Sequence, residues 1–273
     1  NQGPGFGNNK RLSYTRSNLG NHERRGKMSA LLELKGLSGG YSNNKRVLED
    51  VSFTVRRGEI VALIGLNGAG KSTTIKHILG LLKPTSGSIY IEGKTFEEDR
   101  EAYRSQLAYI PETPIYYEEL TLWEHLELTA MTYGLDRQTF EARVEVLLKE
   151  FRMEKRKHRF PSQFSKGMKQ KLMIMMAFMI KPALYIVDEP LLGLDPLGIR
   201  SLLSWLERAK QEGAGILMST HILSTAEKYC DRFIILHHGR IIAQGTLAEL
   251  RQMSKQPHAS LDEIYLELTG DEA

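Results

Sequence analysis

Three short runs of apolar residues, each followed by glycine or polar positions, mark the centre of this chain. They are IVALI at 60–64, ALYIV at 183–187 and GILM at 215–218. Runs of this length are typical of parallel strands that are buried on both faces. The pattern therefore predicts an α/β fold with a parallel sheet. The residues that follow each run are candidates for a functional site, because the carboxyl ends of such strands face the ligand crevice.

Helical patterns fill the middle of the chain. Thr121 and Glu124 form a capping-box pattern, which opens an amphipathic run to Tyr133. A second amphipathic run extends from about Gln138 to Phe151. A third apolar segment, LMIMMAFMI, is interrupted by Lys181 and Pro182. It is far shorter than the roughly 18 apolar residues that a membrane span needs, so a buried core helix is favoured over membrane insertion.

The end of the chain carries two further helix starts. Thr246 with Glu249 and Ser260 with Glu263 each have the spacing of a capping box. They predict two short helices beyond residue 245, packed on the core or on a second copy of the chain.

The charge of the chain is unevenly distributed. The net charge is +4 over 273 residues, but residues 1–27 hold six Lys or Arg and one Glu, which leaves the rest at −1. This leader is expected to be disordered and expression-derived or misassigned, since Met28 is a natural start. A basic arm touching membrane or nucleic acid is the alternative. For the body we expect no nucleic-acid partner. Cys230, the single cysteine, excludes an internal disulfide and fits a reducing cytosol.

A phosphate-binding loop follows the first apolar run. The segment from Gly65 to Ser72 reads GLNGAGKS, which fits G-x-x-x-x-G-K-[ST] between a strand and residues 72–82, where Ile and Leu recur at helical spacing. Glycines let backbone N–H groups approach phosphate, Lys71 would reach the β- and γ-phosphates, and the Ser72 hydroxyl would ligate Mg²⁺. The expected nucleotide-binding residues are Gly65, Asn67, Gly68, Ala69, Gly70, Lys71, Ser72 and Thr73.

Polar residues at the ends of the other two runs complete a candidate catalytic site. Asp188 suits Mg²⁺ coordination, either directly or through a bound water, and Glu189 suits a general base that polarises the attacking water. The alternative is a pair of solvated acids at a strand end. His221 closes GILMSTH and would contact the γ-phosphate from the same crevice. The other histidines, including His77, His125, His237 and His238, are expected to be structural or on the surface.

The segment YIPETP at 109–114 places Glu112 between two prolines. Each proline favours extended geometry in the residue before it, so the segment should be a stiff, non-helical connector. A solvated loop glutamate is the simplest interpretation of Glu112.

Taken in order, these motifs resemble the ABC ATPase family over residues 31 to about 250. In that family an aromatic residue at the place of Tyr41 stacks on adenine, and the loop containing Asp195, in LLGLDP, links two ATP sites across a dimer. The segment FSKGMKQ resembles the family signature L-S-G-G-Q. Ser165 and Gly167 are retained, whereas a lysine and a methionine replace a glycine and a glutamine. In the family, the signature meets the γ-phosphate held by the opposite subunit.

The resemblance implies a domain plan. It implies a P-loop NTPase (RecA-like) core with a parallel sheet, an N-terminal antiparallel β subdomain and an inserted α-helical subdomain. The ABC ATPase domain would cover 28–245, with the helical subdomain at about 115–175 and a helical extension at 246–273. A groove of the helical subdomain would receive a cytoplasmic helix of a membrane partner. The basic run KRKHR at 155–159 is either a solvated face or a contact for anionic headgroups.

The resemblance also makes Glu112 unusual. The family normally has glutamine at this hinge between the core and the helical subdomain. Glutamate keeps an oxygen for Mg²⁺ and loses the amide donors. We therefore hypothesise that Glu112 is a functional hinge ligand of Mg²⁺.

The function that follows is ATP hydrolysis that drives a transporter. YIPETP, LTLWEHLELTAM, FSKGMKQK and SLDEIYLELT resemble the Ecs-type exporter ATPases of Gram-positive bacteria. The resemblance implies ATP and Mg²⁺ as cofactors, an ATP-driven homodimer, and a separate transmembrane permease. The chain would then be a cytoplasmic protein at the inner face of the plasma membrane, with short peptides as candidate cargo. Two alternatives stay open: a soluble ABC ATPase of an assembly complex, and an ATP-binding switch with little hydrolysis.

Overall fold

The computed structural model describes residues 30–42 and 45–270, so the leader at 1–27 lies outside the described residues. A mainly parallel sheet of six strands forms the centre, in the order β5-β6-β7-β3-β8-β9. Only β9 runs antiparallel to its neighbour. Its strands are β3 (Ile60–Ile64), β5 (Leu107–Ile110), β6 (Leu184–Asp188), β7 (Gly215–Thr220), β8 (Arg232–His237) and β9 (Arg240–Gly245). Every residue of β3, β6 and β7 is buried, so the expectation of doubly covered strands is confirmed.

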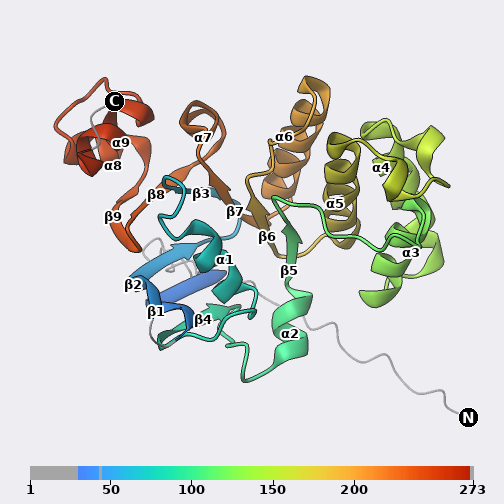
Figure 1. Ribbon diagram of the computed structural model, residues 1–273, viewed down its shortest axis with the longest axis horizontal. Coiled ribbons are helices and arrows are strands. Elements are labelled where there is room, and N and C mark those ends of the chain that lie inside the picture. The colour runs from blue at the N-terminus through green and yellow to red at the C-terminus, as the bar shows by residue number, and fades with distance from the viewer. Residues whose placement is uncertain (1–29, 43–44, 271–273) are drawn as a thin grey trace, which may run out of the picture.

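A second, antiparallel sheet packs against the first (Figure 1). It contains β1 (Leu32–Ser42), β2 (Lys45–Val55) and β4 (Ser86–Ile91), with β1 in the middle. The two sheets share one apolar core, in which Val61 and Leu63 of β3 meet Leu34 and Phe53 of the antiparallel sheet. The fold therefore has the expected α/β core with an N-terminal antiparallel β layer.

Helices cover the opposite face of β5, β6 and β7 and gather at one end of the molecule (Figure 1). They are α3 (Leu122–Thr132), α4 (Arg137–Glu150), α5 (Lys166–Ile180) and α6 (Pro196–Gln211), with short 3₁₀ turns η1 (Glu154–Arg156) and η2 (Pro161–Gln163). The capping box at Thr121 and Glu124 is present. The methionine-rich segment lies inside α5 and is mostly buried, as predicted for a core helix.

The remaining helices are α1 (Lys71–Ile78), α2 (Arg100–Ser105), α7 (Leu223–Tyr229), α8 (Leu247–Met253) and α9 (Leu261–Thr269). Of these, α1 packs in the apolar core that the two sheets share, and the other four lie beside the central sheet. The capping boxes predicted for α8 and α9 are present. In the part of the chain that the structure describes, none of the helices combines the length and the apolar character needed to cross a membrane.

One helix ends earlier than its pattern predicts. Apolar spacing extends to Leu82, but α1 stops at Ile78. Gly80 takes the left-handed conformation at φ 70°, and the N–H groups of Gly80 and Leu81 bond to carbonyls of the last turn. A glycine at this position ends a helix readily, because it adopts positive φ without steric cost.

Candidate active site

The loop between β3 and α1 requires glycine at several positions. Gly68 and Gly70 have φ of 85° and 112°. A Cβ on Gly70 would lie 2.7 Å from the Leu48 side chain, and one on Gly65 would lie 2.5 Å from the carbonyl oxygen of Leu236. Neither space admits a side chain, so the loop keeps the open backbone that phosphate binding needs.

The first turn of α1 has unsatisfied N–H groups. Gly70 is its N-cap and makes no side-chain capping bond, and no acidic residue lies in the first turn. These N–H groups and the positive end of the helix dipole favour an anion at this point.

Lys71 lies inside the loop and does not extend into solvent. Its side chain is buried, and its Nζ donates a hydrogen bond of 2.6 Å to the Gly65 carbonyl. The same Nζ is 3.6 Å from Oε1 of Glu189. A buried ammonium needs such partners, because its charge is costly to remove from water.

The acid pair after β6 is buried. Asp188 and Glu189 are 4% and 7% exposed, so the alternative of two solvated acids is wrong. The Ser219 hydroxyl, at the end of β7, donates a short hydrogen bond to Asp188 and also accepts the Glu189 N–H at 3.2 Å. Burial raises the pKa of Asp188, and the charges of Glu112 and Glu189 add to this effect, while the Ser219 bond opposes it. A carboxylate in this setting gains much from a cation placed beside it.

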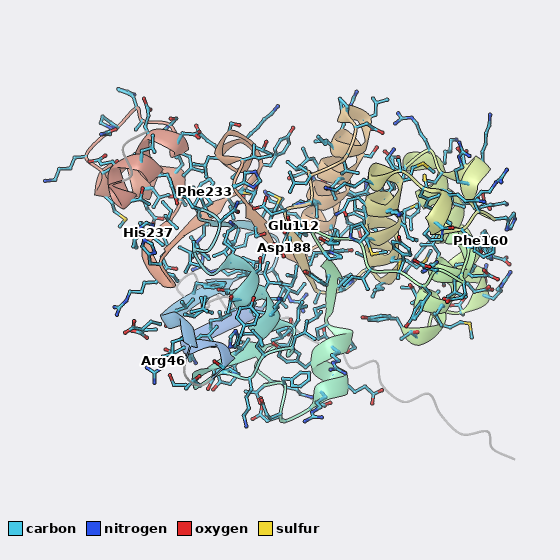
Figure 2. All side chains as sticks on the ribbon, viewed as in Figure 1. Arg46, Glu112, Phe160, Asp188, Phe233 and His237 are labelled. Carbon is cyan, nitrogen blue, oxygen red and sulfur yellow. The ribbon has the colours of Figure 1, made fainter. Side chains whose placement is uncertain are left out.

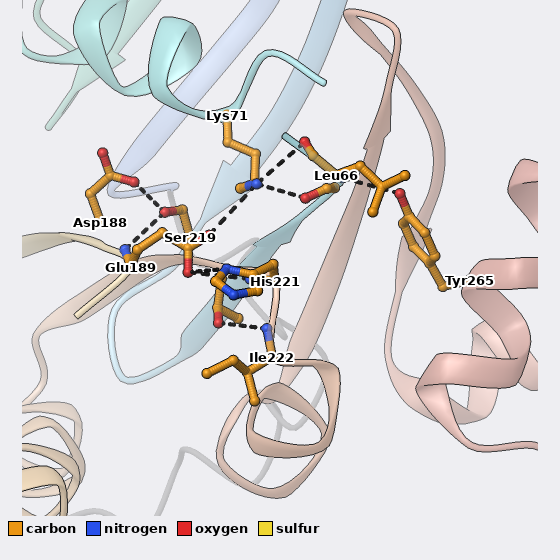
Figure 3. Close-up of polar contacts among 10 residues, drawn as sticks. Leu66, Lys71, Asp188, Glu189, Ser219, His221, Ile222 and Tyr265 are labelled. Carbon is orange, nitrogen blue, oxygen red and sulfur yellow. Dashed lines mark hydrogen bonds and ion pairs between the residues drawn. The ribbon is translucent and has the colours of Figure 1, made fainter. Parts of the chain in front are cut away.

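His221 follows β7 and contacts the same acid (Figure 3). Its Nδ1 is 2.9 Å from Oε2 of Glu189, and its backbone N–H points to the same oxygen at 3.3 Å. An ionised carboxylate only accepts hydrogen bonds, so Nδ1 is the donor. The ring is partly open to solvent. The structure thus brings Lys71, Glu189 and His221 together from three separate elements.

Glu112 lies at the edge of this group. It is exposed and follows β5, the strand that pairs with β6, which ends at Asp188. Figure 2 labels both residues in the same region of the molecule. Tyr109, three residues earlier, brings its hydroxyl within 3.5 Å of Asp188. The segment after β5 is non-helical, as predicted, and it is attached to α5 by a 3.0 Å bond from Gln170 Nε2 to the Pro111 carbonyl.

Tyr41 lies over α1. Lys76 Nζ donates to its hydroxyl at 3.2 Å and lies 4.9 Å from the centre of its ring. Hydrogen bonds with Thr73 and Lys76 lower the pKa of Tyr41. The ring is 56% exposed, which leaves surface for a stacking partner beside the phosphate loop.

The other expected residues form a second group. Ser165 is the N-cap of α5 and accepts the Met168 N–H at 3.3 Å. A Cβ on Gly167 would lie 2.6 Å from the Gly193 carbonyl oxygen, so this helix start packs directly on the LLGLDP loop. Asp195 caps α6 and pairs with Lys171 at 3.0 Å. Within residues 30–42 and 45–270, no hydrogen bond or ion pair joins this group to the phosphate loop.

Sequence reasoning missed three side chains at these two groups. Lys171 holds Asp195, Gln170 holds Pro111, and Tyr109 borders Asp188. Gln170 is the last residue of the signature segment and Lys171 follows it directly, so their position in the sequence could have marked them as candidate site residues. Nothing local marked Tyr109 as different from other strand tyrosines.

The oxygen donors near Asp188 fit Mg²⁺. In residues 30–42 and 45–270, no group of three or more His, Cys, Asp and Glu is arranged to hold a metal ion. Magnesium is usually bound through one or two protein oxygens together with substrate phosphates, and not by a complete protein cage. The Asp188 carboxylate, at the end of β6, and the exposed Ser72 hydroxyl, in the first turn of α1, are hard oxygen ligands of that kind.

The fold and the site define a phosphate-loop ATPase, and comparison with known proteins narrows the class. A model described as ABC transporter matches residues 48–192. The ABC-type transporter ATP-binding protein EcsA of Bacillus subtilis is 64% identical over 89% of this chain and 98% of its own length. The SkfA peptide export ATP-binding protein SkfE of the same species is 37% identical over 78% of this chain and 87% of its own length.

A solved structure agrees with these sequence matches. The ATP-binding subunit of an ABC transporter superposes with a TM-score of 0.85 and 61% identity, covering 87% of this chain and 99% of that one. The chain belongs to the ABC transporter family. It is one of the ATP-binding proteins of that family, which are ATPases.

Proposed function

We propose that this chain powers export by a separate transmembrane permease, with Glu189 as the general base of ATP hydrolysis. The observation that carries the proposal is the buried contact of Glu189 with His221 on one oxygen and Lys71 on the other. A base held by two fixed partners is oriented before water arrives, and positioned proton transfer typically contributes about 10² to 10⁴ in rate.

Each remaining residue of the phosphate-loop group has a proposed role. Lys71 and the loop N–H groups bind the β- and γ-phosphates, and His221 holds Glu189 and contacts the γ-phosphate. Ser72, Asp188 and Glu112 supply oxygens for Mg²⁺, which neutralises phosphate charge when it is bound. Tyr41 stacks on the adenine.

The second group suggests why two copies are needed. At the start of α5, Ser165 is exposed and Gly167 is half-buried, and Asp195 has a 57% exposed side chain. We propose that the helix start meets the γ-phosphate bound by a second copy, while the LLGLDP loop lies between the two sites. ATP would then close a homodimer, and hydrolysis would open it.

The permease is proposed to dock beside the connector at 109–114 that carries Glu112. Large apolar side chains are exposed there and on α3, at Ile115, Tyr117 and Met131, with exposures of 72%, 61% and 70%. Grouped exposed apolar residues mark surfaces that partners cover. Docking there would place the chain at the inner face of the plasma membrane, and the name of SkfE supports peptides as the cargo class.

An ATP-binding switch with little hydrolysis is the second candidate. It is favoured by Glu112, whose charge adds to the pKa increase of Asp188. Repulsion between the Glu112 and Asp188 carboxylates would raise the Mg²⁺ concentration needed to close the site. A neutral residue at 112 would not have this effect.

Hydrolysis by the complex with its permease separates the two candidates. We expect ATP turnover by the wild-type complex, a rise in turnover with a transported peptide, and loss of both in Glu189→Gln. Equal and negligible turnover for wild type and Glu189→Gln in the complex would favour the switch. Failure to co-purify with any membrane protein would refute the exporter role.

A further inference from the structure

The C-terminal helix α9 contacts the phosphate loop directly. The Tyr265 hydroxyl accepts the backbone N–H of Leu66 at 3.1 Å, across 199 residues of sequence (Figure 3). Tyr265 is 5% exposed, whereas the Leu66 side chain is 53% exposed. The loop is therefore held at Leu66 by its backbone and not by side-chain packing.

One peptide group joins Tyr265 to Lys71. The N–H of Leu66 and the carbonyl of Gly65 belong to the same planar peptide. Its N–H donates to Tyr265, and its oxygen accepts the 2.6 Å bond from Lys71 Nζ. Consecutive hydrogen bonds through one peptide polarise each other, so the two contacts support one another.

The position of Tyr265 is set by a well-packed helix. A complete capping box at Ser260 and Glu263 begins α9, and Gly270, with φ 67°, ends it. Its buried face packs in a core cluster with Ala62 and Ile64 of β3, the strand that leads into the loop. The hydroxyl and the loop are thus built on the same rigid cluster.

The same helix also reaches the segment after His221. The Leu261 N–H, at the start of α9, donates to Glu227 Oε2 at 2.7 Å. Glu227 lies on α7, which begins two residues after His221, and Arg251 of α8 lies 3.9 Å from its other oxygen. The C-terminal helices therefore bridge the two segments that carry Lys71 and His221.

We propose that Tyr265 is a positioning residue for ATP binding, which holds the Gly65–Leu66 peptide in the orientation that the phosphate loop needs. The inference rests on the proposed role of this loop in binding ATP phosphates. A loop with Gly65, Gly68 and Gly70 has wide conformational freedom, and ordering it upon binding costs affinity. The Tyr265 bond limits that freedom in advance. Once phosphate is bound the loop is ordered by its ligand, so the chemical step does not depend on Tyr265.

The test uses Tyr265→Phe in the full chain, which keeps the ring and removes only the hydroxyl. Tyr103→Phe is the matched control, because its buried hydroxyl also bonds to backbone, at the Ile78 carbonyl outside the loop. Affinity for AMP-PNP with Mg²⁺ is measured by calorimetry, and turnover is measured by phosphate release from the permease complex. Hydrogen exchange of the Leu66 amide is measured without nucleotide. We expect Tyr265→Phe to weaken AMP-PNP binding by about 3- to 10-fold, as expected for one neutral hydrogen bond. We also expect faster Leu66 exchange and kcat within about twofold of wild type.

Four results would overturn the proposal. Unchanged affinity and unchanged Leu66 exchange in Tyr265→Phe would leave the hydroxyl without a role in the loop. Equal losses in Tyr265→Phe and Tyr103→Phe would indicate general destabilisation. If wild type binds AMP-PNP and Tyr265→Phe matches it, this inference fails alone. If wild type binds no AMP-PNP, the proposed function fails and this inference fails with it.

Discussion

The carboxylate of Glu189 and the ring of His221 form one unit at the ends of β6 and β7. The ring Nδ1 and the His221 N–H both point to Oε2, at 2.9 and 3.3 Å. Glu189 itself has φ 43°, an uncommon conformation for a residue without a glycine's freedom. Its N–H bonds to both the hydroxyl and the carbonyl of Ser219, which holds this backbone in place. The carboxylate is therefore fixed from both its backbone and its side chain.

This arrangement predicts that Glu189→Gln abolishes turnover but keeps ATP binding. Glutamine has nearly the same shape and can still accept from His221, but it cannot take a proton from water. The expected loss in kcat is at least about 100-fold, with the affinity for ATP within a few-fold of wild type. Phosphate release and calorimetry check the two parts. Glu119→Gln, an exposed glutamate in the loop before α3, is the control and should behave as wild type.

Asp188→Asn should stabilise the protein and weaken its response to Mg²⁺. Burial is the first cause that raises the pKa of Asp188, so the folded state holds this proton more tightly than the unfolded state does. A group with a raised pKa makes stability fall as pH rises through the folded pKa, and the charged form is a net cost at neutral pH. Asparagine removes that cost and still accepts the Ser219 hydroxyl. A gain of about 1 kcal/mol would raise Tm by roughly 2–4 °C in a chain of this size.

Thermal melts at several pH values measure this effect. Wild type should gain stability as pH falls through the raised, folded pKa of Asp188 toward its unfolded value, and Asp188→Asn should lack that gain. Mg²⁺ with AMP-PNP should raise Tm less in Asp188→Asn than in wild type. A lower Tm for Asp188→Asn at pH 7 would contradict the expected sign.

The elements that carry the candidate catalytic residues could be predicted from local patterns in the sequence. The strand ends that carry Asp188, Glu189 and His221 followed from two apolar runs and their polar endings, and the helix starts followed from Thr121, Thr246 and Ser260. Such patterns are local, because capping and periodicity involve residues three or four positions apart. They predicted the elements well.

Contacts between distant segments could not be predicted in this way. The Tyr265 bond to Leu66 and the Lys71 contact with Glu189 depend on how α9, the loop and the end of β6 pack in three dimensions. The burial of Asp188 likewise comes from the neighbouring strands and not from its own segment. For α1 the local pattern was misleading, since the apolar spacing continued past Gly80, where the backbone turns left-handed.

Substitution of Asp195 should test its structural role at the start of α6. Asp195 accepts the Gly198 N–H at the start of α6 and pairs with the buried Lys171. Alanine removes the cap and leaves a buried ammonium without its partner, so Asp195→Ala should lose about 1–3 kcal/mol of stability. Asp195→Asn keeps a capping oxygen and should lose less. Chemical denaturation measures both values.

The pH dependence of the same site has the opposite sign to that of Asp188. The Gly198 N–H, followed by Lys171, lowers the pKa of Asp195. Its stabilising contribution is therefore present above the unfolded pKa and is lost as pH falls through the folded pKa. Asp195→Asn should flatten this acid limb of the stability profile. An unchanged acid limb would show that the charge of Asp195 adds nothing to stability through either the Gly198 N–H or Lys171.

Glu112→Gln should lower the Mg²⁺ concentration that half-activates the permease complex, with ATP affinity unchanged. Glu112 is exposed, and its charge adds to the burial that raises the pKa of Asp188. Removing that charge makes the ionised form of Asp188 easier to keep, and the amide oxygen remains available to Mg²⁺. Basal turnover should rise or stay level, because less repulsion opposes closure around the phosphates. Glu112→Ala, which loses both the charge and the oxygen, should need more Mg²⁺ than Glu112→Gln. If both variants match wild type in Mg²⁺ titrations of turnover and in transport, then Glu112 is a solvated loop residue. In that case the Gln170 bond to Pro111 serves only to hold the connector at 109–114 on α5.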